Sequence, residues 1–453
     1  MILRRLFRYV LYFLSAVVTL IVVFFLIGVA PIDRDSYKEK PFYPKMLSHL
    51  DSLSTTTPEL PTGTLHAGYA VVNLTPAFPV STAGYGKRRG KEYTAVHDSI
   101  FVRSVVLDNG KNKVAIVSAD LLIIPPAVTA ILPEKLQRIG FSLDNVYLNA
   151  THTHNSIGNW GERITTLIYG SYKDTVVNFI AERIALSIQE AASDLKQVSM
   201  RYGEFSVASA VRHRIAGSNG HVDDKLRAIE LTRTDSSRMV MVSYNAHPTC
   251  LYARDLELSR DYPGVLVDRL EREGYDFAMF LSGAVGSHGC NPPEYGKPCL
   301  NWMSDEIYSG FQEVRIAMQP VRDSTLAMVR IPLELGDPQF KISQNWRLRS
   351  WVFRALLGES KPNLTALRVG NVLMLGTPCD YSGELREPID SVVSLHGGHA
   401  IITSFNGHYI GYITADQYFD SAHYETRLMN WYGPGNGQYV TDCLVSLAET
   451  MSK

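Results

Sequence analysis

The sequence has few cysteines, almost no net charge and no long run of charge of one sign. Its five cysteines in 453 residues are too few for a disulfide scaffold. With 44 basic and 45 acidic side chains, the formal net charge is -1. A general nucleic-acid binder needs a clustered basic surface, so that class is excluded. Small molecules and lipids are therefore the expected partners.

The cysteine spacing leaves the redox state open. An odd count leaves at least one thiol unpaired, while Cys290 and Cys299 are near enough in sequence to close a short loop in an oxidising compartment. No CxxC pair is present, so nothing indicates a structural zinc site built from thiolates.

Several common catalytic motifs are also missing. The chain has no HExxH helix motif and no GxSxG elbow, and its Gly-rich stretch "SGAVGS" lacks the lysine of a phosphate-binding loop. These absences disfavour a zincin, an α/β-hydrolase of the serine type and a P-loop nucleotide hydrolase.

The N-terminus carries the longest apolar run. Arg4, Arg5 and Arg8 precede 22 residues without a charge, 9–30. As a helix this run would reach roughly 33 Å, enough to span a hydrocarbon core. The preceding arginines favour a cytoplasmic N-terminus and a periplasmic or extracellular location for everything after Pro31. A cleaved signal peptide is the alternative, although its apolar region is usually shorter.

A polar stretch rich in Ser, Thr and Pro follows the apolar run and reads as a stalk. No comparable break occurs after it, and large α/β units often run this long as one domain. We therefore expect an N-terminal Arg segment and membrane anchor in residues 1–30, a linker in 31–62 and one catalytic domain in 63–453.

A strand–helix–strand pattern recurs three times within this domain. The units run from "KVAIVSAD" to "NVYLNATHTH", from "MVMVSYNAH" to "DFAMFLSGAVGS" and from "NVLMLGTPCD" to "HAIITSFNGHYIGY". This alternation predicts an α/β fold with mixed sheets, in which ligands bind beyond the carboxyl ends of strands. Six polar residues end these strands: Asp120, His152, His247, Ser287, Asp380 and Tyr412.

His152 and His154 stand one residue apart at the end of one strand, and His247 ends another. A single histidine is more often a core or surface residue than a ligand. A catalytic zinc needs about three protein ligands plus an open water position, and its water then has a pKa of about 7. The clustering of histidines and carboxylates at strand ends favours such a site.

Five segments in order resemble the catalytic domain of the neutral (alkaline, non-lysosomal) ceramidases. They are "HAGYAVVNLTP", "ATHTHN", "VSYNAHPTC", "FLSGAVGS" and "GYITADQY", and the resemblance covers about residues 65–440. It implies one zinc ion, held by two histidines, a carboxylate and a tyrosine, whose water cleaves the amide of N-acylsphingosine.

The resemblance assigns the zinc ligands to His152, His247, Asp380 and Tyr412. It places His154 in the outer shell or against the scissile group.

It further implies that Arg214 lies near the amide and that Tyr424 steadies the oxyanion. Asp380 stands where the family has glutamate, a side chain one methylene longer. Ser287-His288-Gly289 replaces the family's Ser-Pro-Asn, a difference that concerns the substrate more than the metal.

Some residues keep two interpretations. Ser287 is a helix cap or a substrate contact, and no base is placed by sequence to make it an acyl-enzyme nucleophile. Asp120 either orients a ligand histidine or merely ends a strand. Trp160, Trp302 and Trp431 line an apolar substrate pocket or pack in the core.

The sequence thus predicts a membrane-anchored, zinc-dependent hydrolase that cleaves N-acylsphingosine to a fatty acid and a sphingoid base. Its expected partners are a lipid or other amphipathic amide and the membrane, with no nucleic acid. Two alternatives stay open: a related metal hydrolase acting on another amide or ester, and an inactive lipid-binding relative.

Overall fold

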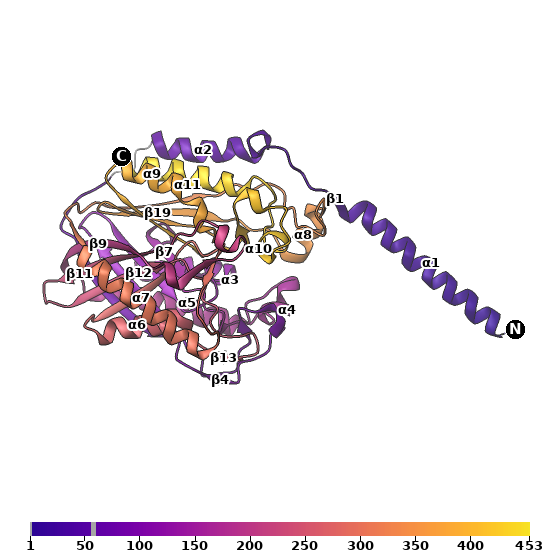
Figure 1. Ribbon diagram of the computed structural model, residues 1–453, viewed down its shortest axis with the longest axis horizontal. Helices are drawn as coiled ribbons and strands as arrows, with labels where there is room; N and C mark the ends of the chain where they lie inside the picture. The colour runs from indigo at the N-terminus through magenta and orange to yellow at the C-terminus, as the bar shows by residue number, and fades with distance from the viewer. Residues whose placement is uncertain (1, 56–59) are drawn as a thin grey trace.

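The computed structural model describes residues 2–55 and 60–453 (Figure 1). Its first helix, α1 (Ile2–Gly28), projects away from the folded body. Residues Arg4–Gly28 are long and apolar enough to cross a membrane, a property that a signal sequence shares. This finding agrees with the apolar run expected from the sequence.

Two sheets form the centre of the body. The larger has nine strands, with β16 (Gln319–Val321) pairing beside β9. Its other strands, in spatial order, are β14 (Phe277–Ser282), β12 (Arg238–Tyr244), β11 (Lys225–Arg233), β9 (Lys196–Ser206), β2 (His66–Asn73), β5 (Phe101–Asp108), β6 (Lys113–Ala119) and β7 (Val146–Ala150). The smaller contains β17 (Leu326–Pro332), β19 (Asn363–Val369), β20 (Val372–Gly376) and β22 (His399–Thr403).

All three strand–helix–strand units are confirmed. The pairs β6–β7, β12–β14 and β20–β22 are the parallel ones within the two sheets, whereas the remaining pairs are antiparallel. Each parallel pair is linked by a helix: α3 (Pro126–Gln137), α6 (Asp261–Arg272) or α9 (Glu387–Leu395). The expected mixed α/β fold is therefore present, because only a crossover can return the chain to a parallel neighbour.

The molecule is built in four layers, helix–sheet–sheet–helix (Figure 1). Apolar side chains of the two sheets meet between them, including Tyr147, Met279 and Met374. Helices α3 and α5 (Asp174–Ser193), with α6 and α7 (Lys297–Ala317), cover the outer face of the large sheet. Helices α9, α11 (Asn436–Ser452) and α2 (Phe42–Thr55) cover the small one.

The carboxyl ends of three strands are joined by one buried amide. The Asn149 side chain, on β7, donates to the carbonyls of Ser282 at 3.3 Å and Ser404 at 2.9 Å. It also accepts from the Ser282 N–H at 3.2 Å. Ser282 ends β14 and Ser404 follows β22, so Asn149 brings together the strand ends of all three units.

Short elements complete the fold. Five two-stranded pairs join β1 (Val29–Pro31) to β18 (Trp346–Leu348), β3 (Thr82–Ala83) to β8 (Ser156–Ile157), β4 (Ala95–Val96) to β13 (Glu257–Leu258), β10 (Val211–His213) to β15 (His288–Cys290), and β21 (Asp380–Tyr381) to β23 (Tyr412–Ile413). The remaining α-helices are α4 (Thr166–Tyr169), α8 (Ser350–Leu357) and α10 (Tyr424–Arg427).

Residues 31–62, expected to be a polar stalk, contain a packed helix. Met46 of α2 is fully buried and Leu50 nearly so, and both contribute to the core beneath the small sheet. The domain boundaries themselves remain predictions, and residues 56–59 of the expected stalk lie outside the described residues.

Candidate metal centre

Three imidazoles converge beyond the carboxyl ends of the strands. The Nε2 atom of His247 lies 2.9 Å from that of His152 and 2.9 Å from that of His154, and the last two are 3.3 Å apart. We call His152, His154 and His247 the histidine cluster. Such a group of buried or half-buried nitrogens is able to hold a metal ion.

Two members of the cluster, His154 and His247, favour the neutral form. Burial lowers the pKa of His247 well below its ordinary value, and His152 and Arg214 lower it further. The pKa of His154 is likewise held well below normal by burial and then by His152. A neutral imidazole keeps a lone pair on one ring nitrogen, which is the form that binds a metal.

His152 is oriented by its backbone and by two neighbours. It follows β7 with φ 62°, a left-handed conformation that few residues other than glycine adopt. Its ring stacks on Phe405 at 4.0 Å, and its Nδ1 donates to the Leu122 carbonyl at 2.5 Å, which leaves the Nε2 lone pair free. Asp120 instead accepts from the Phe101 N–H, so the orienting role considered for it falls to Leu122.

His247 follows β12, and its Nδ1 lies 3.4 Å from the Val285 carbonyl and 3.1 Å from Arg214 Nη1. With the proton on Nδ1, the ring donates to Val285 and presents an unprotonated Nε2 to the cluster. With the proton on Nε2, Nδ1 accepts from Arg214 instead. The first tautomer is the one that a bound cation would select.

A buried carboxylate lies beside the histidines. Asp380 Oδ1 is 3.3 Å from His152 Nε2 and has no hydrogen-bond partner, although Asp380 is fully buried. Its other oxygen accepts from the Tyr409 hydroxyl at 2.7 Å. An unpartnered buried carboxylate oxygen is costly unless a cation compensates it, so this donor set fits a metal ion.

Tyr412 is brought to the same place by the β21–β23 pair, in which Asp380 lies opposite Tyr412. Its ring centre is 6.3 Å from that of His247. Burial and then Asp380 raise the pKa of the Tyr412 phenol well above its usual value, and Arg214 opposes the rise. Arg214 is held over the Tyr412 ring at 5.9 Å and forms a 2.5 Å ion pair with Glu425.

Tyr424 and Ser287 lie differently. Tyr424 is 52% exposed, with its ring 6.3 Å from that of Tyr412, so it stands at the rim of the site. Ser287 is fully buried, and its hydroxyl contacts the Glu384 carboxylate and His288 Nδ1. The Ser287 hydroxyl is therefore satisfied by protein partners rather than by the histidine cluster.

The three tryptophans considered for the substrate pocket lie in different parts of the molecule. Trp431 stacks edge-on against Tyr409, the residue bonded to Asp380, at 5.5 Å. Trp160 stacks on Tyr169 at 4.1 Å. Trp302 packs against the core between α6, α7 and the large sheet, as the core interpretation expects.

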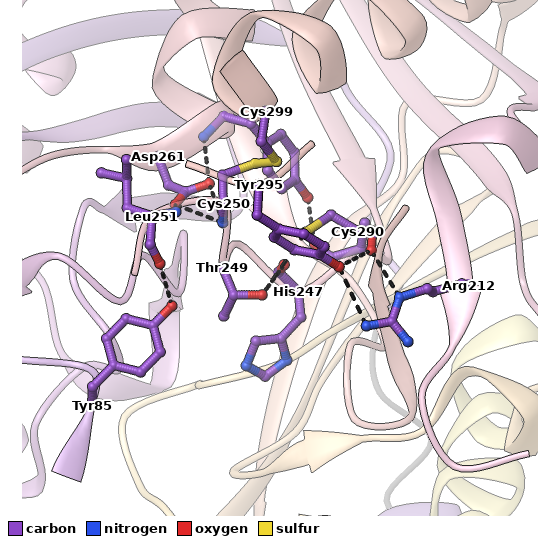
Figure 2. Close-up of a disulfide and its surroundings, with 12 residues drawn as sticks. Tyr85, Arg212, His247, Thr249, Cys250, Leu251, Asp261, Cys290, Tyr295 and Cys299 are labelled. Carbon is purple, nitrogen blue, oxygen red and sulfur yellow. Dashed lines mark hydrogen bonds between the residues drawn. A yellow bond between two sulfur atoms is a disulfide. The ribbon is translucent and has the colours of Figure 1, made fainter. Parts of the chain in front are cut away.

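The disulfide joins Cys250 to Cys299, not Cys290 to Cys299 (Figure 2). The short spacing of the latter pair was misleading, because Cys250 lies far away in sequence but reaches the start of α7. Cys290 is a buried free thiol beside the bridge. Cys250 stands three residues after His247, so the bridge fixes the loop that carries a member of the histidine cluster.

Sequence reasoning missed four contributors: Leu122, Phe405, Tyr409 and Glu425. Leu122 acts through its carbonyl, for which side-chain identity gives no signal. Phe405 and Tyr409 stand in "SFNGHY", the end of the third unit, where an aromatic pair before Tyr412 was the available signal.

The fold and the site together define a mixed α/β protein with a buried histidine and carboxylate cluster suited to a metal ion. Residues 67–280 match the family model for the N-terminal part of neutral/alkaline non-lysosomal ceramidase. This segment carries β2 to β14, hence two of the three parallel units and all three histidines. The matched segment is thus similar to the N-terminal part of the neutral/alkaline ceramidases, the family that the sequence motifs resemble.

Solved structures are similar to this chain in fold. Neutral ceramidase from Pseudomonas aeruginosa is similar with a TM-score of 0.73 and 17% identity, over 86% of this chain and 75% of that one. A ceramidase complexed with C2 gives a TM-score of 0.73 and 16% identity over the same shares. A search of curated proteins gave no match.

Proposed function

We propose that this protein is a zinc-dependent amide hydrolase that cleaves N-acylsphingosine to a fatty acid and a sphingoid base. One observation carries the proposal: three imidazole nitrogens within 3.3 Å of one another adjoin the unpartnered, buried Asp380 carboxylate oxygen. With their Nε2 atoms unprotonated, the rings direct lone pairs at one another, and a cation among them would remove that repulsion. The family match supplies the amide as the bond to be cleaved.

The zinc ligands in this proposal are His152, His247, Asp380 and Tyr412. His154 is kept as the residue beside the scissile group, although its Nε2 is as close to His247 as that of His152. Zinc bound there would polarise the amide carbonyl and make a water molecule nucleophilic at neutral pH.

The remaining site residues act on the substrate. Arg214, fixed by Glu425, presents a guanidinium beside the place where negative charge develops on the carbonyl oxygen. Tyr424, at the rim, donates a hydrogen bond from its hydroxyl to the same carbonyl oxygen. His154 is neutral and able to accept a proton from water and return it to the leaving amine. Ser287 contributes through the loop that it holds rather than as a nucleophile.

We also propose that α1 anchors the protein with its N-terminus in the cytoplasm and the catalytic domain outside it. Arg4, Arg5 and Arg8 precede the apolar run, as the positive-inside rule requires. The Cys250–Cys299 bridge supports an oxidising location for the domain.

The test combines metal content and turnover in detergent-purified protein. His152→Ala and His247→Ala should each lose most of the bound zinc by elemental analysis and nearly all fatty-acid release from N-acylsphingosine. His396→Ala, at an exposed histidine in the turn after α9, is the matched control and should keep both. Unchanged zinc stoichiometry in both cluster variants would refute the site.

A second candidate is a metal hydrolase of a different amide or ester. It is favoured by the Ser287 hydroxyl, which is engaged by Glu384 and His288 where the family loop reads otherwise. Zinc retained by the wild-type protein, with release from another acyl substrate but none from N-acylsphingosine, would select it. Absence of zinc with retained lipid binding would instead identify an inactive relative.

A further inference from the structure

Large exposed apolar side chains gather at one end of the body. Outside α1, the described residues include fifteen such side chains, and six of them belong to three segments that lie together. These six are Ile164, Leu167, Trp346, Trp351, Leu356 and Leu428, each at least 37% exposed. We call them the docking face. A grouped apolar surface of this kind marks an interaction site, whereas scattered single residues do not.

Direct contacts connect the three segments. Arg163, beside Ile164, donates to the Ala355 carbonyl of α8 at 3.0 Å. Phe353 of α8 lies 5.8 Å from the Trp431 ring, three residues beyond Leu428. In Figure 1, α8, α10 and α4 lie on the side of the body from which α1 leaves.

The docking face adjoins the end of α1. The Trp351 indole N–H donates to the Ile27 carbonyl at 3.0 Å, and the Arg349 N–H donates to the Gly28 carbonyl at 2.8 Å. The following strand β1 pairs with β18, with Pro31 opposite Trp346. Two exposed tryptophans are thus fixed at the point where the apolar helix meets the domain.

This placement identifies the occupant as a lipid bilayer. Any bilayer that α1 crosses must end near Gly28, which is where tryptophan is favoured in membrane proteins, at the boundary of hydrocarbon and headgroups. The stretch from Trp346 to Gly358 also contains three arginines and no carboxylate. Arg354 pairs with Asp337 at 2.7 Å, so Arg347 and Arg349 are the two that suit phosphate headgroups.

We propose that the docking face rests on the outer surface of the membrane that holds α1 and admits the lipid substrate to the site directly from the bilayer. An aromatic series connects the two places. The Phe353 ring contacts the Trp431 ring, and the centre of the Trp431 ring lies 5.5 Å from that of Tyr409. The Tyr409 hydroxyl donates a hydrogen bond to Asp380. The docking itself rests on membrane insertion of α1, and substrate entry rests on the proposed hydrolase activity.

The first experiment measures contact without turnover. The full chain is reconstituted into phosphatidylcholine vesicles with or without brominated lipid, and tryptophan fluorescence is recorded. Brominated lipid should quench the wild-type protein, and Trp346→Phe/Trp351→Phe should show a quenched fraction smaller by about twofold or more, because both indoles lie at the interface. Equal quenching of the two proteins would overturn the proposal. So would an unquenched wild type that dimerises in sedimentation, since a second copy would then cover the face.

The second experiment measures delivery of the substrate. Leu167→Ser/Leu356→Ser should lower kcat/KM for N-acylsphingosine embedded in vesicles by about tenfold, because apolar contact with the bilayer is lost. It should leave hydrolysis of a short-chain analogue dispersed in detergent unchanged. The control Ile316→Ser/Leu395→Ser changes side chains that are 77% and 84% exposed elsewhere and should affect neither reaction.

Failure of the docking proposal and failure of the proposed hydrolase function give different results in the two experiments. A protein that is quenched by lipid but cleaves no N-acylsphingosine retains the docking face and loses the proposed hydrolase function. A protein that cleaves both substrates equally well after the leucine changes, and is not quenched, loses the docking face alone.

Discussion

His152 and Phe405 form a strained pair at the residue scale. Both lie in the left-handed region, with φ 62° and 68°, and their rings stack nearly parallel, 8° apart. Such a backbone costs of order 1–3 kcal/mol and persists only where its surroundings fix it. Here the strain aims one ring nitrogen at the cluster, while the other is used by Leu122.

Tyr409 should tune metal affinity without touching the metal. Tyr409→Phe removes the hydroxyl that donates to Asp380, so the carboxylate loses its orientation and we expect zinc affinity to fall by about tenfold. Chelator competition measures this change. The control is Tyr439→Phe in α11, which removes a hydroxyl that donates to the Glu334 carbonyl. This variant should lose stability but keep its zinc affinity. Equal affinities for wild type and Tyr409→Phe would contradict the assignment.

His408 should make stability depend on acid pH. Burial lowers its pKa from 6.5 to about 4, so between these values the unfolded chain binds a proton that the folded protein excludes. Its contribution to the free energy of unfolding is complete above pH 6.5 and is lost as pH falls, by about 2 kcal/mol at pH 4 after allowance for partial exposure.

The measurement is urea unfolding of wild type and His408→Gln, both with chelator, from pH 8 to 4. The difference between the two proteins should be constant above pH 6.5 and should change as pH falls, with the wild type losing more stability. Parallel curves throughout would show that His408 titrates normally in the folded protein.

At the scale of elements, three parallel strand pairs supply the site. Histidines follow β7 and β12, and Asp380 and Tyr412 follow β20 and β22 on the short β21–β23 pair. Asn149 bridges the ends of β7, β14 and the segment after β22, so it holds the loops in register with one another.

Asn149→Ala should lower the free energy of unfolding by about 3 kcal/mol, because the buried Ser282 N–H and Ser404 carbonyl both lose their hydrogen bond to this side chain, while the Ser282 carbonyl keeps the Ser404 N–H. Denaturant unfolding monitored by circular dichroism measures this loss. Asn178→Ala, at a half-buried helical position in α5, should cost less than about 1 kcal/mol. Similar losses in the two variants would show that the strand ends are held by other contacts.

The elements were largely predictable from sequence, because each unit is a local alternation of apolar and polar segments. His152, His247, Asp380 and Tyr412 were found at strand ends for the same reason. Their neighbours were not: Phe405 reaches His152 across more than 250 residues, and Cys250 reaches Cys299 across 49. Contacts of that separation depend on how the layers pack, which no local pattern records. The packed helix α2 in the expected stalk was missed because its few apolar residues are diluted by polar ones.

At the scale of the whole molecule, α1 is separate from the four layers. Its described residues are exposed apart from the half-buried Val17 and the buried Gly28 at its end, whereas β1 and α2 are attached to the body. The apolar helix therefore adds an anchor without adding to the core.

Removal of residues 1–28 should release the protein from membranes and lower the free energy of unfolding by only about 1–2 kcal/mol, since the hydrogen bonds to the Ile27 and Gly28 carbonyls are lost but no core contact is. Carbonate extraction of membranes and denaturant unfolding measure the two effects. If the shortened protein stays bound to membranes, the docking face provides most of the membrane attachment. If it fails to fold, α1 is not separate from the folded body.

The proposed ligands come from residues 152 to 412, spread across both sheets. A nascent chain that ends before Tyr412 does not hold them all, and loop-closure entropy delays such distant pairings until late in folding. Binding of the metal ion would then require that both sheets have assembled. A misfolded copy, or one that ends before Tyr412, would lack the complete proposed site, so the proposed hydrolase activity would require the assembled domain.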